Sequence, residues 1–168
     1  MKPKLLLPAS GLNPLDKQSK QAAPLPIDSS LFFQLVRVVN LTARPFTESL
    51  SRRHQLSLNE WRVMVVLASH PGVAARDVVD HTGLDKMSVS RALASLQRSA
   101  RLQRQPDAQD ARRTLLWLSA AGHQLFETLG AAATERERQI FAGVSAAEQK
   151  QLKKTVAKLL QALSTTQA

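Results

Sequence analysis

The chain has 168 residues and a formal net charge of +10, from 23 Lys and Arg against 13 Asp and Glu. That length suits a single domain with a long tail or an added oligomerisation element. The charge favours polyanionic partners, of which nucleic acid is the usual one. The absence of Cys excludes disulfides, thiol catalysis and redox sensing, and Cys-based zinc sites.

Neither a membrane span nor a signal peptide is expected. The longest apolar run, Val63–Ala68, is far shorter than the ~20 residues that a bilayer requires. The apolar residues Leu5–Leu7 follow two lysines, but Pro8 ends that run too early for a signal peptide. We therefore expect a cytoplasmic protein that does not associate with membranes.

Residues 1–27 are predicted to form a disordered basic tail. They contain five of the eight prolines, and no helical or strand period can persist between them. The four lysines of this segment could contact DNA phosphates, although a tail without any role is the simpler interpretation.

Helices are predicted on both sides of a central turn. Asp28 or Ser29 can cap a first helix, in which Pro45 predicts a kink. Ser57 and Glu60 have the spacing of a capping box at the start of a second helix, which ends at residues 70–72. A short helix at 74–82 is followed by Gly83, where a turn between helices commonly needs a positive φ.

The next helix, capped by Asp85 and covering about 86–99, buries one apolar face. Its buried residues are expected to be Val89, Ala92, Leu93 and Leu96. Alternating residues then predict strands near 102–106 and 113–118, joined by a polar turn. Ser119 caps a helix to about Ala142, and a second capping box at 145–148 opens the last helix.

This order predicts a mainly α protein with a small β-hairpin wing on a helix-turn-helix core. Helix 86–99 is the candidate recognition helix, because a major groove admits one α-helix whose N-terminal half reaches base edges. Arg91 could bind a guanine edge or a phosphate. An ordinary solvated helix face is the alternative interpretation of these side chains.

The position of the charge favours DNA binding. Residues 86–113 contain seven cations and two acids, which is half of the net charge in a sixth of the chain. Arg112 is the candidate for the wing tip, where it would enter a minor groove. The predicted DNA-binding residues are Lys86, Ser88, Ser90, Arg91, Ser95, Arg98, Arg104, Arg112 and Arg113.

Several segments in this order resemble the MarR (multiple antibiotic resistance regulator) family of winged-helix transcription factors. They are LSLNEWRV at 56–63, TGLD at 82–85, VSR at 89–91, DARR at 110–113 and LSAAG at 118–122. The resemblance implies an obligate homodimer that reads a pseudo-palindromic operator. We expect it to act as a repressor, with activation as the alternative. It also implies that Asp110 orients Arg112 through an ion pair.

The resemblance divides the chain beyond the tail into a dimerisation helix at 28–56, a winged helix-turn-helix core at 57–118 and C-terminal dimerisation helices at 119–168. Apolar stripes in the outer segments fit a dimer, with packing inside one chain as the alternative. The predicted interface residues are Leu31, Leu35, Val38, Leu152, Val156, Leu159 and Leu163.

One pair of residues departs from the family pattern. Family members usually have Gly-Leu before the first wing strand, where this chain has Ala100 and Arg101. Ala100 is unfavourable if that position needs a positive φ. Arg101 replaces an apolar residue, and we expect it to add a phosphate contact.

The resemblance also implies regulation by a small aromatic or anionic effector. Phe46, Trp61 and Arg62 could line its pocket, although core packing explains Phe46 and Trp61 equally well. The four histidines are dispersed without an i, i+4 pair, so neither a metal site nor a cofactor is expected.

Three other functions remain as alternatives. A non-specific architectural DNA-binding protein would show a strong salt dependence without sequence preference. A winged helix that binds protein would not need the basic cluster at 86–113. No catalytic motif is present in the sequence, so we do not expect an enzyme.

Overall fold

The computed structural model describes residues 27–110 and 112–166, apart from the side chains of residues 45–47, 49–51 and 165–166. The predicted tail, except for its last residue, lies outside the described residues. The chain divides into two compact units, residues 1–40 and 41–168, and each is described by itself.

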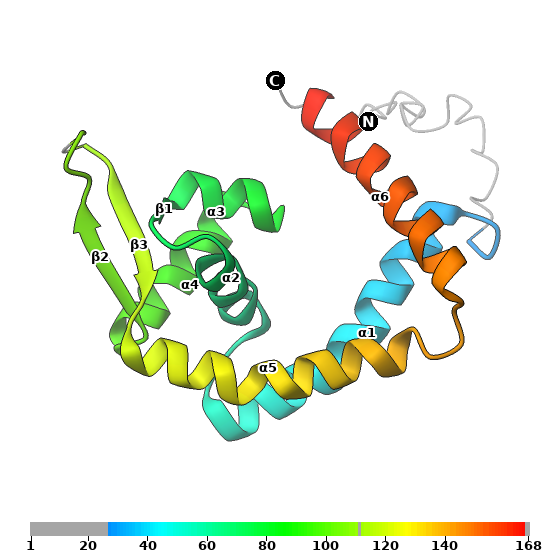
Figure 1. Cartoon of the computed structure of the whole chain (residues 1–168), viewed down its shortest axis with the longest axis horizontal. Coiled ribbons are helices and arrows are strands. Elements are labelled where there is room, and N and C mark those ends of the chain that lie inside the picture. Colours follow the sequence, from blue (N-terminus) through cyan, green and yellow to red (C-terminus); the bar gives the residue numbers. More distant parts are fainter. Residues whose placement is uncertain (1–26, 111, 167–168) are drawn as a thin grey trace, which may run out of the picture. The chain divides into compact units, whose positions relative to one another are not determined.

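Helices dominate the fold, and three short strands form a single antiparallel sheet (Figure 1). The elements in chain order are α1 (Leu31–His54), α2 (Leu58–Ser69), β1 (Val73–Ala74), α3 (Ala75–Thr82), α4 (Lys86–Arg98), β2 (Leu102–Pro106), β3 (Thr114–Leu118), α5 (Ala120–Ile140) and α6 (Ala146–Thr166). This order confirms the predicted mainly α class with a hairpin wing.

The first helix is capped by a different residue from the two that were predicted. Ser30, not Asp28 or Ser29, caps α1, because its hydroxyl accepts the backbone N–H of Phe33 at 3.3 Å. The helix runs through Pro45 to His54 without a break. Proline removes one backbone hydrogen bond, and the bonds on either side of it keep this long helix continuous.

Side chains cap the other helices where the sequence predicts. The hydroxyl of Ser57 accepts the N–H of Glu60 at 3.2 Å, and the Glu60 carboxylate accepts the N–H of Ser57 at 2.7 Å. Ser145 and Glu148 make the same reciprocal pair before α6. These contacts satisfy N–H groups that have no partner inside a helix, so they fix where α2 and α6 begin.

The hairpin is extended by a short third strand. β2 and β3 pair antiparallel from Leu102 opposite Leu118 to Pro106 opposite Thr114. β1 adds to the other edge of β3, so the sheet order is β1-β3-β2. A strand of two residues is too short to show an alternating pattern, which is why the sequence did not predict β1.

The core is centred on α2, which packs against α3, α4, α5 and β3. Val63, Met64 and Leu67 of α2 are fully buried. The predicted inner face of α4 is confirmed, since Val89, Ala92, Leu93 and Leu96 are all buried. This packing leaves the opposite face of α4 free to contact a partner.

Large apolar side chains are exposed on α1 and α6 in the single chain. They include all seven residues predicted for the dimer interface: Leu31, Leu35, Val38, Leu152, Val156, Leu159 and Leu163. Among them, Leu31 is 66% exposed and Leu163 is 62% exposed. No described helix has the length and hydropathy needed to cross a membrane.

Candidate nucleic-acid interface

A tight turn sets the recognition helix at an angle to the helix before it. Gly83 adopts φ +65°, a left-handed conformation that glycine takes without strain. Asp85 then caps α4, with its carboxylate accepting the N–H of Ser88 at 2.8 Å and the Ser88 hydroxyl at 2.6 Å. Hydrogen bonds from Ser88 lower the pKa of Asp85 below its usual value, so this cap stays ionised at neutral pH.

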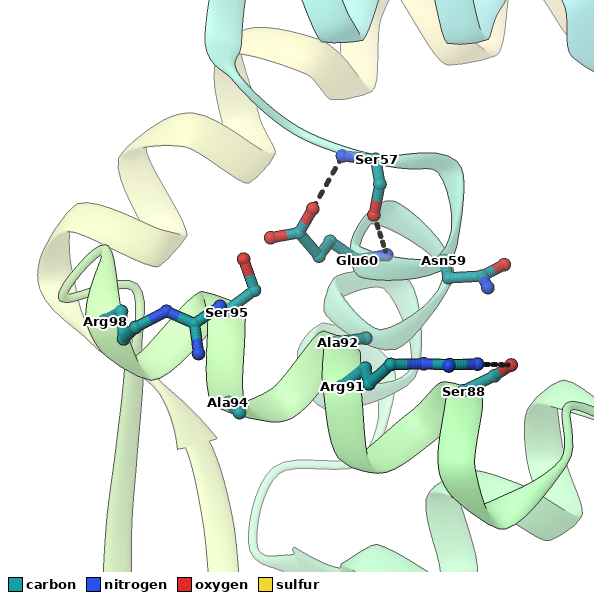
Figure 2. A pocket seen from close by; sticks show the side chains of 9 residues that line it. All are labelled: Ser57, Asn59, Glu60, Ser88, Arg91, Ala92, Ala94, Ser95 and Arg98. Carbon is teal, nitrogen blue, oxygen red and sulfur yellow. Dashed lines mark hydrogen bonds between the residues drawn. The ribbon is translucent and has the colours of Figure 1, made fainter.

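The outer face of α4 carries the predicted DNA-binding residues. Lys86, Ser90, Arg91 and Arg98 are exposed, and Ser88 and Ser95 are half-buried. Arg91 approaches the Ser88 hydroxyl at 3.5 Å, which directs its guanidinium toward the N-terminal end of the helix (Figure 2). The long cations can therefore reach past the small serines to a nucleic acid lying along this face.

A hollow of about 420 Å³ separates this face of α4 from the start of α2 (Figure 2). Arg91 and Arg98 lie on one side of it, and Asn59 and Glu60 lie on the other. Burial raises the pKa of Glu60, but hydrogen bonds from Ser57 and Ser95 and the charge of Arg101 outweigh it and hold the pKa below its usual value. The Glu60 carboxylate is thus engaged by the protein, and the two arginines are the cations of the hollow that can donate to a phosphate.

Two further hollows lie beside the wing, and α4 borders the first of them. One of about 740 Å³ lies between α3, α4 and β2 and includes Lys86, Ser90 and Arg104. A neighbouring hollow of about 870 Å³ includes Arg104, Arg112 and Arg113. Arg76 of α3 lines both hollows, so it joins the basic surface formed by α4 and the wing.

The sequence analysis missed two exposed residues of this surface. Arg76 lies outside the charged segment 86–113, and its proximity to the wing depends on the fold. Met87, in the first turn of α4, is 65% exposed, which is unusual for a large apolar side chain. An apolar residue at this end of a recognition helix suits contact with a thymine methyl group.

The turn of the wing is held by its two aspartates. Asp110 accepts the backbone N–H of Arg112 at 3.0 Å, which differs from the expected ion pair to the Arg112 side chain. The ion pair of the turn joins Arg113 to Asp107 at 3.9 Å. Asp110 therefore supports Arg112 through the backbone, and the Arg112 side chain is exposed.

Arg101 does not point toward this surface, so the expected phosphate contact is wrong for the chain as described. Its guanidinium donates to the backbone carbonyl of His54 at 2.8 Å. The concern about Ala100 is confirmed, because its φ is +57°. At the junction between α4 and the wing, Ala100 thus adopts a positive φ at the position where the family usually has glycine.

A smaller apolar pocket of about 280 Å³ lies between α1, α2 and α5. The predicted residues Trp61 and Arg62 line it together with Arg136. Trp61 is 8% exposed and stacks on Phe126, with ring centroids 5.3 Å apart, so it belongs to the core and also lines the pocket. The side chain of the third predicted residue, Phe46, lies outside the described residues.

Arg136 is the least satisfied side chain of this pocket. Its Nε atom is buried and has no hydrogen-bond partner among the described residues. A buried N–H without a partner is costly, and an anion in the pocket would satisfy it.

Two histidines that are far apart in sequence meet in the fold. The rings of His70 and His81 stack with centroids 4.4 Å apart and an angle of 10° between their planes. Their spacing in the sequence, eleven residues apart and without an i, i+4 relation, gives no sign of this contact. Among the described residues, no group of three or more His, Asp or Glu side chains could hold a metal ion.

A helix-turn-helix with an exposed basic recognition helix, followed by a basic hairpin, defines a winged-helix DNA-binding protein. The sequence profile of the MarR family matches residues 54–113, from the end of α1 to the turn of the wing. No curated protein sequence matches the chain closely enough to count as a relative.

Solved structures extend the likeness beyond the core. A probable transcriptional regulator from Pseudomonas aeruginosa is 28% identical, with a TM-score of 0.67 over 79% of this chain and 98% of that one. A MarR/EmrR family transcriptional regulator from Acinetobacter sp. ADP1 is 24% identical, with a TM-score of 0.70 over 81% and 99%. BpsR from Bordetella bronchiseptica, whose DNA binding is regulated by 6-hydroxynicotinic acid, is 21% identical, with a TM-score of 0.71 over 82% and 97%.

Over residues 54–113 the chain matches the MarR family, and the solved structures that share its fold include transcriptional regulators of that family. The comparisons support DNA binding and the regulation of transcription.

Proposed function

We propose that this protein is a homodimeric repressor that binds a pseudo-palindromic operator in the cytoplasm. The observation that carries the proposal is the set of exposed cations on α4 and the wing. Lys86, Arg91, Arg98, Arg104 and Arg112 are all exposed on it. Six or more such phosphate contacts per dimer would anchor the protein, while the start of α4 reads base edges.

The exposed apolar residues of α1 and α6 support the homodimer. Isolated apolar side chains are common on surfaces. Two helices that each expose a series of Leu, Val or Phe are expected to bury them in an interface with another chain. We assign residues 28–56 and 119–168 to dimerisation and 57–118 to DNA binding. Two-fold symmetry would place two copies of α4 about one DNA turn apart, roughly 34 Å.

Selection of bound sequences from a random duplex pool at ~150 mM salt tests this proposal. A dimeric operator-binding protein should enrich an inverted repeat whose half-sites are centred about one helical turn apart. Uniform recovery of all sequences, combined with a steep salt dependence, would favour a non-specific architectural protein instead.

We also propose that the pocket between α1, α2 and α5 binds a small aromatic carboxylate that weakens DNA binding. Trp61 offers an aromatic wall, and Arg62 and Arg136 offer two guanidinium groups for a carboxylate. The buried Nε of Arg136 favours an anionic ligand. BpsR, whose DNA binding is regulated by 6-hydroxynicotinic acid, supplies the precedent for this ligand class.

Titration of the protein–operator complex with a panel of substituted benzoates and nicotinates tests the pocket. An effective compound should release the operator from the wild-type protein and lose potency at least tenfold with Arg136→Ala. Arg138→Ala is the matched control, because Arg138 is exposed on the same helix and paired with Glu135. Equal potency in both variants would remove the pocket from the mechanism.

A further inference from the structure

Arg101 connects three parts of the molecule through its backbone. This residue lies between the end of α4 and the start of β2. Its N–H donates to the carbonyl of Leu96 in α4 at 2.8 Å, and its carbonyl accepts the N–H of Ser119, before α5, at 3.1 Å. The recognition helix, the wing and α5 are therefore all joined at the backbone of this one residue.

The approach of α5 to Arg101 is very close. A Cβ atom placed on Gly122 would lie 2.2 Å from the Arg101 carbonyl oxygen, so only glycine fits at that position. The Ser119 hydroxyl also donates to the carbonyl of Ala100 at 2.6 Å. The backbone at residues 100–101 is thus held against α5 with little freedom to move.

The side chain of Arg101 adds a contact to a distant part of the sequence. One guanidinium nitrogen donates to the His54 carbonyl at 2.8 Å, and the other approaches the Gln55 carbonyl at 3.5 Å. These carbonyls lie at the C-terminal end of α1, where helix acceptors have no partner within the helix. Arginine suits this position, because its fork of donors can serve two carbonyls and its charge opposes the negative end of the helix dipole.

Backbone strain is concentrated around the same contact. Gln55 and Ala100 are the two non-glycine residues with positive φ among those described, at +48° and +57°. Such conformations are disfavoured for residues with a side chain and persist only where the surroundings hold them. Gln55 directly follows α1, and its carbonyl is approached by the Arg101 guanidinium. Ala100 directly precedes Arg101 in the chain.

The Arg101 guanidinium also interacts with protein groups rather than with solvent alone. Arg101 is half-buried, and its charge acts on the Glu60 carboxylate that caps α2. Its donors are therefore directed at the end of α1 and its charge acts on α2, whereas Arg98, three residues earlier, is exposed. The two arginines have the same charge and different surroundings, which makes Arg98 a natural control.

We propose that Arg101 is a positioning residue that fixes the junction of the recognition helix and the wing to the C-terminal end of α1. Through this contact the DNA-binding surface is presented in one orientation relative to the end of α1. The inference rests on the proposed operator binding. It assigns a positive role to the arginine that stands where the family usually has an apolar residue.

The test compares the operator affinity of Arg101→Leu, Arg101→Lys and Arg98→Ala with that of the wild type between 50 and 200 mM salt. We expect Arg101→Leu to bind about tenfold more weakly with an unchanged slope of log affinity against log salt, because it removes no phosphate contact. Arg101→Lys, which can still donate to the His54 carbonyl, should recover most of the affinity. Arg98→Ala should reduce the slope by about one.

Two results would overturn the inference. An Arg101→Leu variant that binds within twofold of wild type would show that the contact does not position the surface. A slope reduced as in Arg98→Ala would show that Arg101 contacts a phosphate directly. If Arg101→Leu shows no cooperative unfolding transition, Arg101→Gln replaces it in the test. The Gln amide suits a half-buried polar site, and we expect the same loss of affinity and the same unchanged salt slope.

The wild-type protein reports separately on the proposed function. Failure of the wild type to enrich any sequence overturns operator recognition, and the inference falls with it. A wild type that binds its operator while folded Arg101 variants bind equally well overturns only the inference.

Discussion

At the scale of single residues, a substitution of Arg112 tests whether the wing contacts DNA. Its backbone is fixed by Asp110, while its side chain is free to enter a minor groove. We predict that Arg112→Ala weakens operator binding by roughly 1–3 kcal/mol. Fluorescence anisotropy at constant salt measures the change. Arg138→Ala removes the same charge outside the proposed interface, and equal losses in both variants would contradict a role for the wing.

Glu60 gives a second prediction at this scale, which concerns stability and pH. Its carboxylate is buried, and its pKa is held below the usual value of 4.5 by bonds from Ser57 and Ser95 and by the charge of Arg101, which together exceed the opposing effect of burial. A carboxyl whose pKa is lower in the folded state stabilises the fold above its unfolded pKa. That contribution disappears as the pH falls through the folded pKa.

Glu60→Gln should therefore lower the free energy of unfolding at pH 7 by about 1–3 kcal/mol, the usual range for a lost charged hydrogen bond. The difference from wild type should shrink as the pH falls from above 4.5 toward 3. Urea unfolding at several pH values measures it. A difference that stays constant across this range would mean that the charge of Glu60 contributes nothing.

At the scale of elements, the sequence predicts most of the winged-helix core. Capping residues carry strong local signals, so the starts of α2, α4 and α5 coincide with Ser57, Asp85 and Ser119. The buried face of α4 follows from the helical period of four apolar residues. Local chemistry of this kind is fully visible in the order of amino acids.

Features that depend on contacts between distant segments could not be predicted. The strand β1 exists because Val73 and Ala74 pair with β3, more than forty residues later. Arg101 looks like a free cation in the sequence, and its partners His54 and Gln55 are 46 or 47 residues away. Arg76 joins the basic surface for the same reason. Charge and period reveal a surface, but only the fold determines which charges belong to it.

The helix α5 provides a prediction about packing. Gly122→Ala would place a methyl group against the Arg101 carbonyl, where no flexible side chain can move aside. We expect the free energy of unfolding to fall by about 1–3 kcal/mol or more, the range for overpacking. Gly130→Ala, in the same helix with nothing within 4 Å of its Cβ, should instead stabilise by about 0.5–1 kcal/mol. Similar effects of both substitutions would mean that α5 does not pack closely on residue 101.

At the scale of the whole molecule, the exposed apolar residues of α1 and α6 concern assembly. A protomer that exposes such helices in water pays a large solvation cost, which a second copy removes by covering them. A two-fold dimer also explains how a small basic surface could reach useful specificity, because each operator then carries two half-sites. A substitution that dissociates the dimer should consequently also weaken DNA binding.

We predict that the double substitution Leu159→Glu and Leu163→Glu dissociates the dimer, because it places two charges on the apolar face of α6. Light scattering should give the mass of one chain, near 18.5 kDa, and operator affinity should fall by at least 100-fold. Lys154→Glu changes the net charge by the same amount on the opposite face of α6 and should leave the dimer intact. A double variant that keeps the mass of a dimer would exclude α6 from the interface, and a monomer that retains full operator affinity would show that DNA binding does not require the pair.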